Sequence, residues 1–517
     1  MDTALADRLA ARHYLHSQGW IARRSEHFRH LPPPALEAWI GPEPDAPACE
    51  APALSGAGWL LQPVGPAATA GVDARWLDAL DPAQRNALFA DLPGPGDGEA
   101  APFAWAHRAL CRQGLRLRIH TPPGKATADC DTVWLHLHHQ PRDTVEAPLL
   151  VMTLEPGVRC VLIETHDRAP SACGHALVQN LHTHIHLAEG AQLQHLRLAL
   201  PQAQDRMAQH VHARLAQGAR YQQALVATGA AYHLQRTVVQ LQGANAQART
   251  AALLLPAGQV LDQQVHTRLD AAHTAAHTEV LALAADHERV VANAHSRIAP
   301  GAHEAQVRQR LSGVALNGQP RMVLRPHLEI LHDQVQATHG ATWGRLPEDA
   351  LFYALQRGLD EAQARALLTE GMARAVLERA FDDDPGAQAL AQCLRAIAVL
   401  RQLRGCQDPR GFQRRRAKHH RNGGFAAQAG IAQELGIQKE NIFILRSGNV
   451  LELNEEKAGV TGQVAAGAIL VDGLGIGDVG NVVLRDRQHL AEDGIMIVVV
   501  ALDSISGQLL LILAVLI

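Results

Sequence analysis

The chain has 517 residues, a formal net charge of −4 and a hydrophobic content of 47%. This length exceeds what one ordinary hydrophobic core needs, so we expect two or three domains. A nearly balanced charge excludes a general electrostatic affinity for nucleic acid or for anionic membranes. Thirty histidines are an unusual number, and they invite a metal-binding interpretation that has to be tested position by position.

The chain carries seven cysteines, and no two of them form a CxxC pair. The odd count and the lack of a secretory signal predict reduced thiols in a cytoplasmic protein. The longest apolar run, 509–517, is about nine residues long, whereas a membrane-spanning helix needs roughly 20. We therefore expect no association with a membrane.

The first 110 residues are mixed in character. Residues 2–18 have the pattern of a short amphipathic helix. The stretch 31–101 is rich in proline, glycine and alanine, which is typical of loops rather than sheet. An N-terminal helical and irregular region is therefore predicted over 1–110.

Residues 111–345 follow a different pattern. Short apolar segments alternate with small or polar turns, and Gly190, Gly218 and Gly243 mark three of these turns at intervals of 28 and 25 residues. A loose repeat of this size is typical of stacked coils, because a single coil cannot bury its inner face alone. The sequence predicts a β-helix core over 111–345, with a two-sheet sandwich as the structural alternative.

The run 325–344 closes this region. Apolar residues at strand spacing lead into residues 338–342, which read as a small-residue turn that presents His339. Gly340 adds no side chain beside this imidazole, so its coordination sphere is open. Iron or zinc takes three or four ligands, so a metal site at His339 has to be shared with a partner subunit. The alternative is a polar residue that only satisfies a turn.

Residues 346–403 carry a helical pattern. Pro347 and two acidic residues open the first helix, Gly358 ends it, and Asp360 caps the next. One more helix is expected over 387–403. This segment is therefore predicted to be a C-terminal helical region.

A basic linker over 404–425 follows the helices. Its run 404–421 holds seven lysines and arginines, which could contact the phosphates of RNA in a salt-dependent way. Only one aromatic residue, Phe412, lies among these charges, and no fold signature accompanies them, so a solvated linker is the interpretation we favour and nucleic acid is not an expected partner.

From residue 1 to about 385 the chain resembles the SufD family of the SUF iron–sulfur cluster assembly scaffold. The resemblance is carried by Ala305-Gln306, Gly318-Gln319-Pro320, the run 325–344 and the following LPEDALFYALQRGLDEAQARALL; the stretch 19–30 resembles the family's N-terminal signature. It implies a mainly β fold, in which a right-handed parallel β-helix is flanked by helical N- and C-terminal regions. It also implies a SufBCD complex with SufB and the ATPase SufC, which docks on the C-terminal helical region.

The resemblance also implies a site. In the family the turn that ends the β-helix reads Cys-Ser-His-Gly, and its histidine is implicated in building the nascent cluster at the interface with SufB. His339 matches that histidine, whereas Ala337 stands where the family has the cysteine. The expectation is a chain that holds no cofactor alone and contributes His339 to iron or a nascent Fe–S cluster shared with SufB.

Residues 426–507 resemble ribonuclease J over about 80 residues, most closely in LVDGLGIGDVGNVVLRDR and HLAEDGIMIVVV. The two-metal nuclease of that family needs a His-x-His-x-Asp-His motif, because two cations must clamp the phosphate and activate water. The 517 residues contain no such motif. Residues 426–517 are therefore predicted to be a small α/β segment, a ribonuclease J-like fragment without its active site, in a fused or chimeric chain.

Three other sequence patterns are weaker candidates for a functional site. His182, His184 and His186 share one face of a predicted strand and could chelate a metal, although a solvated outer face is the favoured interpretation. The cluster 134–139 is weaker still. The glycines at 473–477 are not followed by Lys-Ser/Thr, which excludes a phosphate-binding loop.

The sequence as a whole predicts a non-enzymatic, SufD-like scaffold component. The alternative is an RNA-processing protein of the ribonuclease J type, inactive here. A β-helix enzyme that acts on polysaccharide is disfavoured, because aromatic residues for stacking on sugars make up only 4% of the chain.

Overall fold

The computed structural model describes residues 3–381, apart from 23–24, 41–58, 64–70, 123, 125–130, 140, 142–144 and 167–175; beyond residue 381 it describes only strands. The chain divides into two compact units, Met1–Gln407 and Asp408–Ile517. The predicted helix 387–403 and the basic linker 404–425 lie outside the described residues, as do the glycines at 473–477.

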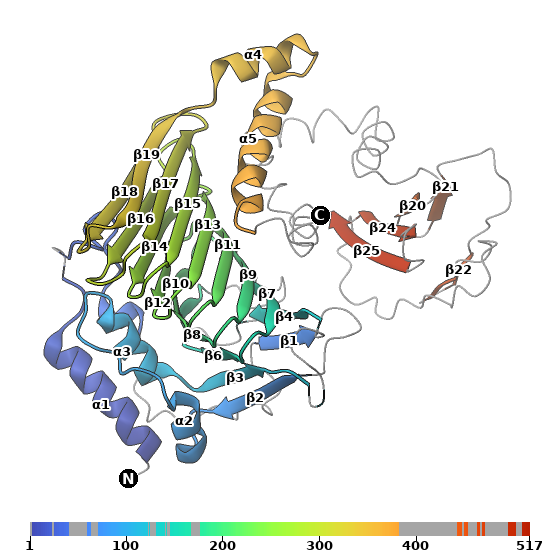
Figure 1. Ribbon diagram of the computed structural model, residues 1–517. Coiled ribbons are helices and arrows are strands. Elements are labelled where there is room, and N and C mark those ends of the chain that lie inside the picture. The colour runs from blue at the N-terminus through green and yellow to red at the C-terminus, as the bar shows by residue number, and fades with distance from the viewer. Residues whose placement is uncertain are drawn as a thin grey trace. The chain divides into compact units, whose positions relative to one another are not determined.

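The first unit is built around a parallel β-helix, which confirms the predicted fold (Figure 1). Successive strands alternate between two sheets. Sheet A contains β4 (Val133–His139), β7 (Arg159–His166), β9 (Gln192–Ala199), β11 (Arg220–Thr228), β13 (Gln247–Leu255), β15 (Ala275–Ala284), β17 (Ala305–Ala315) and β19 (Val335–Arg345). Sheet B contains β3 (Gln113–Ile119), β6 (Leu149–Leu154), β8 (Val178–Leu187), β10 (Arg206–Leu215), β12 (Tyr232–Leu241), β14 (Val260–Leu269), β16 (Arg289–Ile298) and β18 (Arg321–Ile330), with the short β5 (Val145–Glu146) beside β8.

Left-handed residues form one corner of the β-helix. Gly190 and Gly218 have φ of +65° and +64°, and each donates its N–H to a carbonyl of the next coil. The third equivalent position is Asn245, with φ of +60°, so Gly243 is not the repeat position that the sequence suggested. Asparagine tolerates this conformation better than most residues, because its short polar side chain can bond locally.

Antiparallel strands begin both sheets. β1 (Trp59–Pro63) pairs with β4, and β2 (Val72–Asp78) pairs with β3. The sequence pattern did not predict these two strands, whereas the Pro/Gly cluster 92–96 forms a loop as predicted. Each of the two strands provides backbone partners for a strand of the first coil, whose N–H and C=O groups would otherwise remain unpaired.

The N-terminal helices lie at the sheet B side of the unit. They are α1 (Thr3–Gln18), which confirms the helix predicted over 2–18, the short η1 (Leu36–Ala38), α2 (Pro82–Phe89) and α3 (Ala101–Leu110). α1 packs on α3, and α3 packs on β8. Among the described residues, no helix combines the length and apolar character needed to cross a membrane.

Two helices follow the β-helix as predicted, α4 (Glu348–Gln356) and α5 (Glu361–Glu378). Asp360 caps α5 and forms a capping box with Gln363. The last turns of α5 cover an apolar strip on the outer face of sheet A, which includes Leu253 and Leu281 (Figure 1). The outer face of this sheet is therefore a second hydrophobic core.

The C-terminal unit is described only by its strands. β20 (Ile442–Arg446), β21 (Asn449–Glu452), β24 (Ile495–Leu502) and β25 (Leu509–Leu516) form an antiparallel sheet, and β22 (Gln463–Ala465) pairs with β23 (Ala468–Leu470). Any helix of the expected α/β segment falls outside these residues.

The interior of the β-helix is partly polar. Glu164, fully buried on β7, accepts hydrogen bonds from Nε2 of His139, His166 and His195 at 2.7, 3.1 and 2.9 Å. The buried Nε of Arg197 lies 3.5 Å from the same carboxylate and balances its charge. A buried carboxylate is tolerated only when it is paired in this way, so the network is a structural constraint on the first coils.

The histidines decide the charge state of Glu164. Burial by itself raises the pKa of Glu164, but the hydrogen bonds from His139, His166 and His195 outweigh it and hold this pKa well below its usual range. Because the folded-state pKa lies below the unfolded value, the carboxylate stabilises the fold above the unfolded pKa. That contribution is lost as the pH falls through the folded-state pKa.

We predict that Glu164→Gln lowers the free energy of unfolding by about 3–5 kcal/mol at neutral pH, because Arg197 is left buried without its partner. Urea unfolding followed by tryptophan fluorescence measures this loss, since all seven tryptophans lie between residues 20 and 343. The matched control is Glu155→Gln, whose partially exposed carboxylate pairs with the exposed Arg118. It should cost about 1 kcal/mol or less. Equal losses in both variants would contradict a special role for Glu164.

Candidate functional site at the end of the β-helix

His339 lies in the middle of β19, the last strand of sheet A, and its side chain is exposed. The prediction of a turn over 338–342 is therefore wrong. The backbone of this run pairs in parallel register with β17, where His339 is opposite Gln309. Its small residues favour a turn, but the unpaired edge of β17 provides the hydrogen bonds that a strand needs.

The coil that contains β18 and β19 leaves one end of the β-helix open (Figure 1). No strand among the described residues pairs with the outer edges of β18 and β19. Large apolar side chains are exposed at the same end: Ile330 by 45%, Leu331 by 44% and Trp343 by 75%. An unpaired sheet edge with apolar neighbours is a surface that another chain can extend.

His339 also continues a row of buried polar side chains. Cross-strand register places His195, Gln223, Thr250, Thr278, Gln309 and His339 in successive coils of sheet A. All but His339 are buried. The row begins at the Glu164 network and ends at the only one of the six side chains that no further coil covers.

Ala337 lies two residues before His339 and therefore faces the same side of β19. It is partly buried against the aliphatic core of the β-helix. The family that this chain resembles carries cysteine at this position, whereas this chain has a small residue that packs against the core. Among the described residues, no group of three metal-ligating side chains includes His339.

A second set of polar rows covers the outer face of sheet B. One row contains His184, His212, Val238, His266, His295 and His327, which are register partners from β8 to β18. The sequence pattern missed this row, although the interval between His184 and His212 equals that between Gly190 and Gly218. Histidines repeated at the coil interval were the signal that could have revealed it.

The stripe His182, His184 and His186 is less solvated than predicted. His182 is buried with 4% exposure, and its ring stacks between His107 of α3 and His210 of β10 at centroid distances of 4.4 and 4.6 Å. Burial, together with the neighbouring His107, holds the pKa of His182 well below its usual range. His186 remains exposed. The stripe is therefore a packing surface for α3 at one end and solvated at the other.

The cluster 134–139 separates into two environments. The rings of His136 and His138 are tilted against each other with centroids 3.6 Å apart, and both approach Thr165 Oγ1, whereas His139 belongs to the buried Glu164 network. Sequence reasoning singled out neither Glu164 nor Arg197, because their roles depend on neighbours from other coils.

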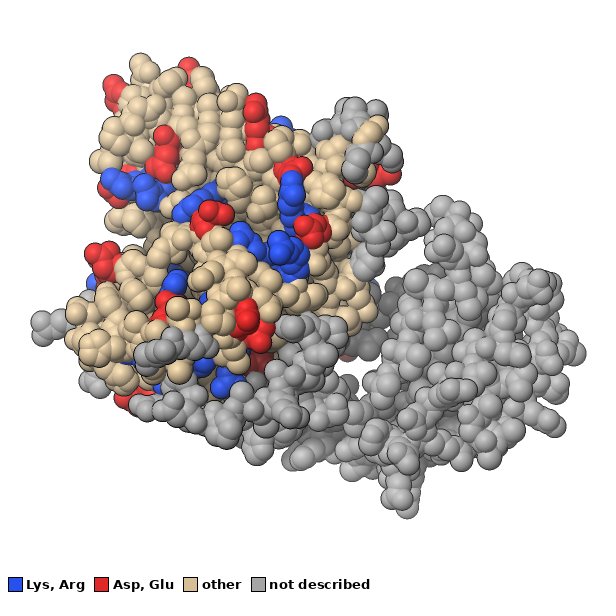
Figure 2. All heavy atoms as spheres, turned by 90° about the horizontal axis from the view of Figure 1, so that it is seen from below, with Lys and Arg blue, Asp and Glu red and all other residues tan. Residues whose placement is uncertain are grey.

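Charge does not mark a nucleic-acid surface on the face that Figure 2 shows. Basic and acidic side chains are interspersed there among neutral ones. Among the described residues, several basic side chains are paired with acidic ones, including Arg379 with Glu279 at 2.6 Å. Such a face lacks the continuous basic patch that phosphate binding needs.

Comparison with curated proteins finds ribonuclease J relatives for a short segment of the chain. The chain is 47% identical over 77 residues to ribonuclease J2 of Bacillus subtilis, 52% over 77 residues to ribonuclease J 2 of Staphylococcus aureus and 51% over 75 residues to ribonuclease J 1 of Streptococcus pyogenes. These matches cover 14–15% of this chain and 13–14% of the relatives. The chain thus spans about one seventh of the length of these relatives, which agrees with the predicted fragment.

The β-helical part of the chain matches a different family of proteins. Residues 137–372 match the family described as SUF system FeS cluster assembly, SufBD core domain. The match contains β-strands of both sheets, the open end with His339, and helix α4. It confirms the resemblance carried by the run 325–344. The β-helical part of this chain is therefore similar to the SufBD core domain family of the SUF iron–sulfur cluster assembly system.

Proposed function

We propose that this chain is a SufD-like, non-enzymatic component of a SufBCD scaffold complex that assembles iron–sulfur clusters in the cytoplasm. The observation that carries the proposal is a SufBD core domain whose β-helix ends in an unpaired, partly apolar coil with an exposed histidine. In this proposal residues 111–345 are the scaffold, residues 346–403 dock an ATPase, and the segment 426–517 contributes no catalysis.

The open end fits a SufB-like subunit. Backbone N–H and C=O groups along β18 and β19 can continue both sheets into a second β-helix, and Trp343 supplies a large apolar contact. His339 then lies at the junction, on the side of the strand that faces the interior row. A single imidazole with no converging ligand of its own requires the partner to complete a site for iron or a nascent cluster.

The helical region fits a SufC-like ATPase. α4 exposes Phe352 by 64% and Tyr353 by 60%, and α5 exposes Leu367 by 57%. Two neighbouring helices with exposed apolar side chains are typical of a protein interface. Because α5 is anchored on sheet A through its last turns, its first turns and α4 remain accessible.

We predict that His339→Ala lowers cluster maturation about tenfold or more in a reconstituted complex with SufB and SufC. Complex assembly, followed by size-exclusion chromatography, should be unchanged because the imidazole is not part of the sheet pairing. Thr338→Ala on the opposite face of β19 is the matched control and should mature clusters normally. Normal maturation by the His339 variant would refute the role of this residue.

We predict that Phe352→Ser weakens binding of the SufC-like ATPase about tenfold or more, since burial of a phenylalanine side chain contributes roughly 1.5–3 kcal/mol. Binding to the SufB-like subunit should not change. Surface plasmon resonance with each partner measures both affinities. Leu60→Ser on β1, a residue that is also exposed, serves as the control and should affect neither.

The alternative function, an RNA-processing enzyme of the ribonuclease J type, has a direct test. We predict no phosphodiesterase activity on single-stranded RNA with Zn²⁺ or Mn²⁺, because the sequence contains no His-x-His-x-Asp-His motif to hold two metal ions. Hydrolysis above the rate of a buffer control would favour the alternative over the scaffold.

A further inference from the structure

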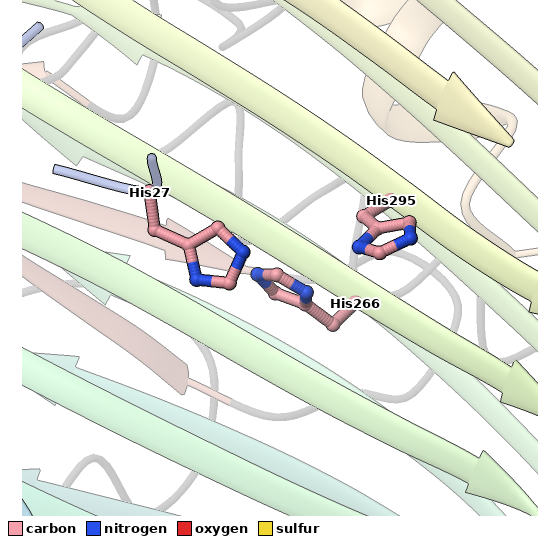
Figure 3. Close-up of side chains that lie close together, drawn as sticks. All are labelled: His27, His266 and His295. Atoms are coloured by element: carbon pink, nitrogen blue, oxygen red, sulfur yellow. The ribbon is translucent and has the colours of Figure 1, made fainter. Parts of the chain in front are cut away.

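Three imidazoles from distant parts of the chain meet on the outer face of sheet B: His27, His266 and His295 (Figure 3). One nitrogen of each lies within 4.8 Å of the others. The centroid of the His266 ring is 4.8 Å from that of His27 and 5.6 Å from that of His295. His266 and His295 are register partners on β14 and β16, so backbone pairing fixes two of the three rings.

The third ring is held in place by the contacts of its own segment, residues 25–30. Gln264 Nε2 donates to the carbonyl of His27 at 3.1 Å, and Arg325 donates to the carbonyl and the carboxylate of Glu26 at 3.0 and 2.7 Å. Phe28 is buried with 1% exposure. These contacts bring His27 to the sheet without any contribution from the imidazoles themselves.

Two of the rings have a nitrogen that is suited to an additional ligand. His295 Nε2 is buried and has no hydrogen-bond partner among the described residues; the Glu329 carboxylate is 3.9 Å away. His27 Nδ1 lies 3.3 Å from Glu99, which also accepts the backbone N–H of His27 at 3.0 Å. A carboxylate against one nitrogen orients a metal-binding histidine and leaves its other nitrogen for the ion. Figure 3 shows the rings turned towards one another.

His266 has one nitrogen already in use. Arg236 donates to His266 Nε2 at 2.9 Å, so Nδ1 is the nitrogen left for an ion. The guanidinium is also the closest positive charge to the cluster, and two carboxylates, Asp262 and Glu99, interact with it. The Glu99 carboxylate, 3.3 Å from His27 Nδ1, offsets the repulsion that a bound cation would otherwise meet.

A second group of possible metal ligands converges in the described part of the chain: His139, Glu164 and His166. It differs from the His27 group in its hydrogen bonds and in its burial. Its Nε2 atoms already contact the Glu164 carboxylate, and Arg197 balances the charge. A cation there would displace the hydrogen bonds that hold the fully buried Glu164 carboxylate. The three histidines of the His27 group are only partly buried, and Nε2 of His295 has no hydrogen-bond partner among the described residues.

We propose that His27, His266 and His295 bind a divalent first-row transition-metal ion, of the class of Zn²⁺ or Fe²⁺, which fastens the segment 25–30 to the β-helix. Imidazole nitrogens suit such ions. Zinc–nitrogen bonds of about 2.0–2.1 Å place tetrahedral ligands roughly 3.4 Å apart, so small ring rotations close the site. Three protein ligands leave a fourth position for water. The inference does not depend on the function proposed above.

The test uses the full chain, freed of metal with a chelator and titrated with Zn²⁺. We expect a high-affinity equivalent of Zn²⁺ in calorimetry, and slower amide hydrogen exchange in the peptide that contains residues 25–30. His295→Gln should weaken this equivalent about 100-fold or more and abolish the metal-dependent protection. Co²⁺ in place of Zn²⁺ should give the visible absorption of tetrahedral coordination, and His27→Gln should remove it.

The matched control is His303→Gln, which alters an exposed histidine that belongs to neither group of converging ligands; its ring centroid is 5.2 Å from that of His273. It should retain both the affinity and the protection, which separates the site from surface histidines. Each variant is first shown to unfold at the wild-type urea concentration, so that a loss of binding is not a loss of fold. Zn²⁺ protection that persists in His295→Gln, or that is absent from the wild type, would overturn the proposal.

Discussion

In-register parallel pairing of successive coils is the constraint on which the rest of this molecule depends. Each coil donates and accepts backbone hydrogen bonds with the next, and the left-handed corner at Gly190, Gly218 and Asn245 repeats the same N–H to carbonyl contact. Any change in coil length has to be absorbed outside the strands, because a slip of one residue would turn every side chain to the opposite face. The pairing thus keeps equivalent side chains on the same face of each sheet from coil to coil.

This pairing converts sequence repetition into rows of side chains. Inside the β-helix it produces the polar row from His195 to His339, and on the outer face of sheet B it produces the histidine row from His184 to His327. Neither row requires residues that are close in sequence. Polar groups in a packed interior demand partners, and the Glu164 network shows that neighbouring coils supply them. The chain combines a rigid frame with polar sites that the frame itself aligns.

Much of the frame could be predicted from the sequence, since alternating strands, small turns and helix caps are local signals. The caps at Asp360 and the end of α4 near Gly358 follow from one or two residues each. β1 and β2 could not be predicted in the same way, because their strand state depends on the exposed edge of the first coil. The prediction of a turn over 338–342 failed for the same reason, because pairing with the edge of β17 outweighs the turn preference of small residues.

The candidate sites also differ in whether they depend on local sequence or on residues from distant strands. His339 was found through a local motif, whereas Glu164 and Arg197 are ordinary residues until three coils surround them. The cluster of His27 with His266 and His295 joins positions more than 200 residues apart, and no spacing rule reaches that far. A site that depends on one local motif can be predicted from the sequence. A site whose side chains come from different coils can be found only when the pairing register of the strands is known.

The two ends of the stack differ in kind. One end carries the antiparallel strands β1 and β2, whose direction opposes the repeat, and the other end carries the parallel strands β18 and β19, to whose outer edges no strand of the described residues is paired. Joining two such stacks at their parallel ends uses up that end on both and leaves only antiparallel ends outside. End-to-end growth therefore terminates after one step, and the geometry favours a closed pair over a filament.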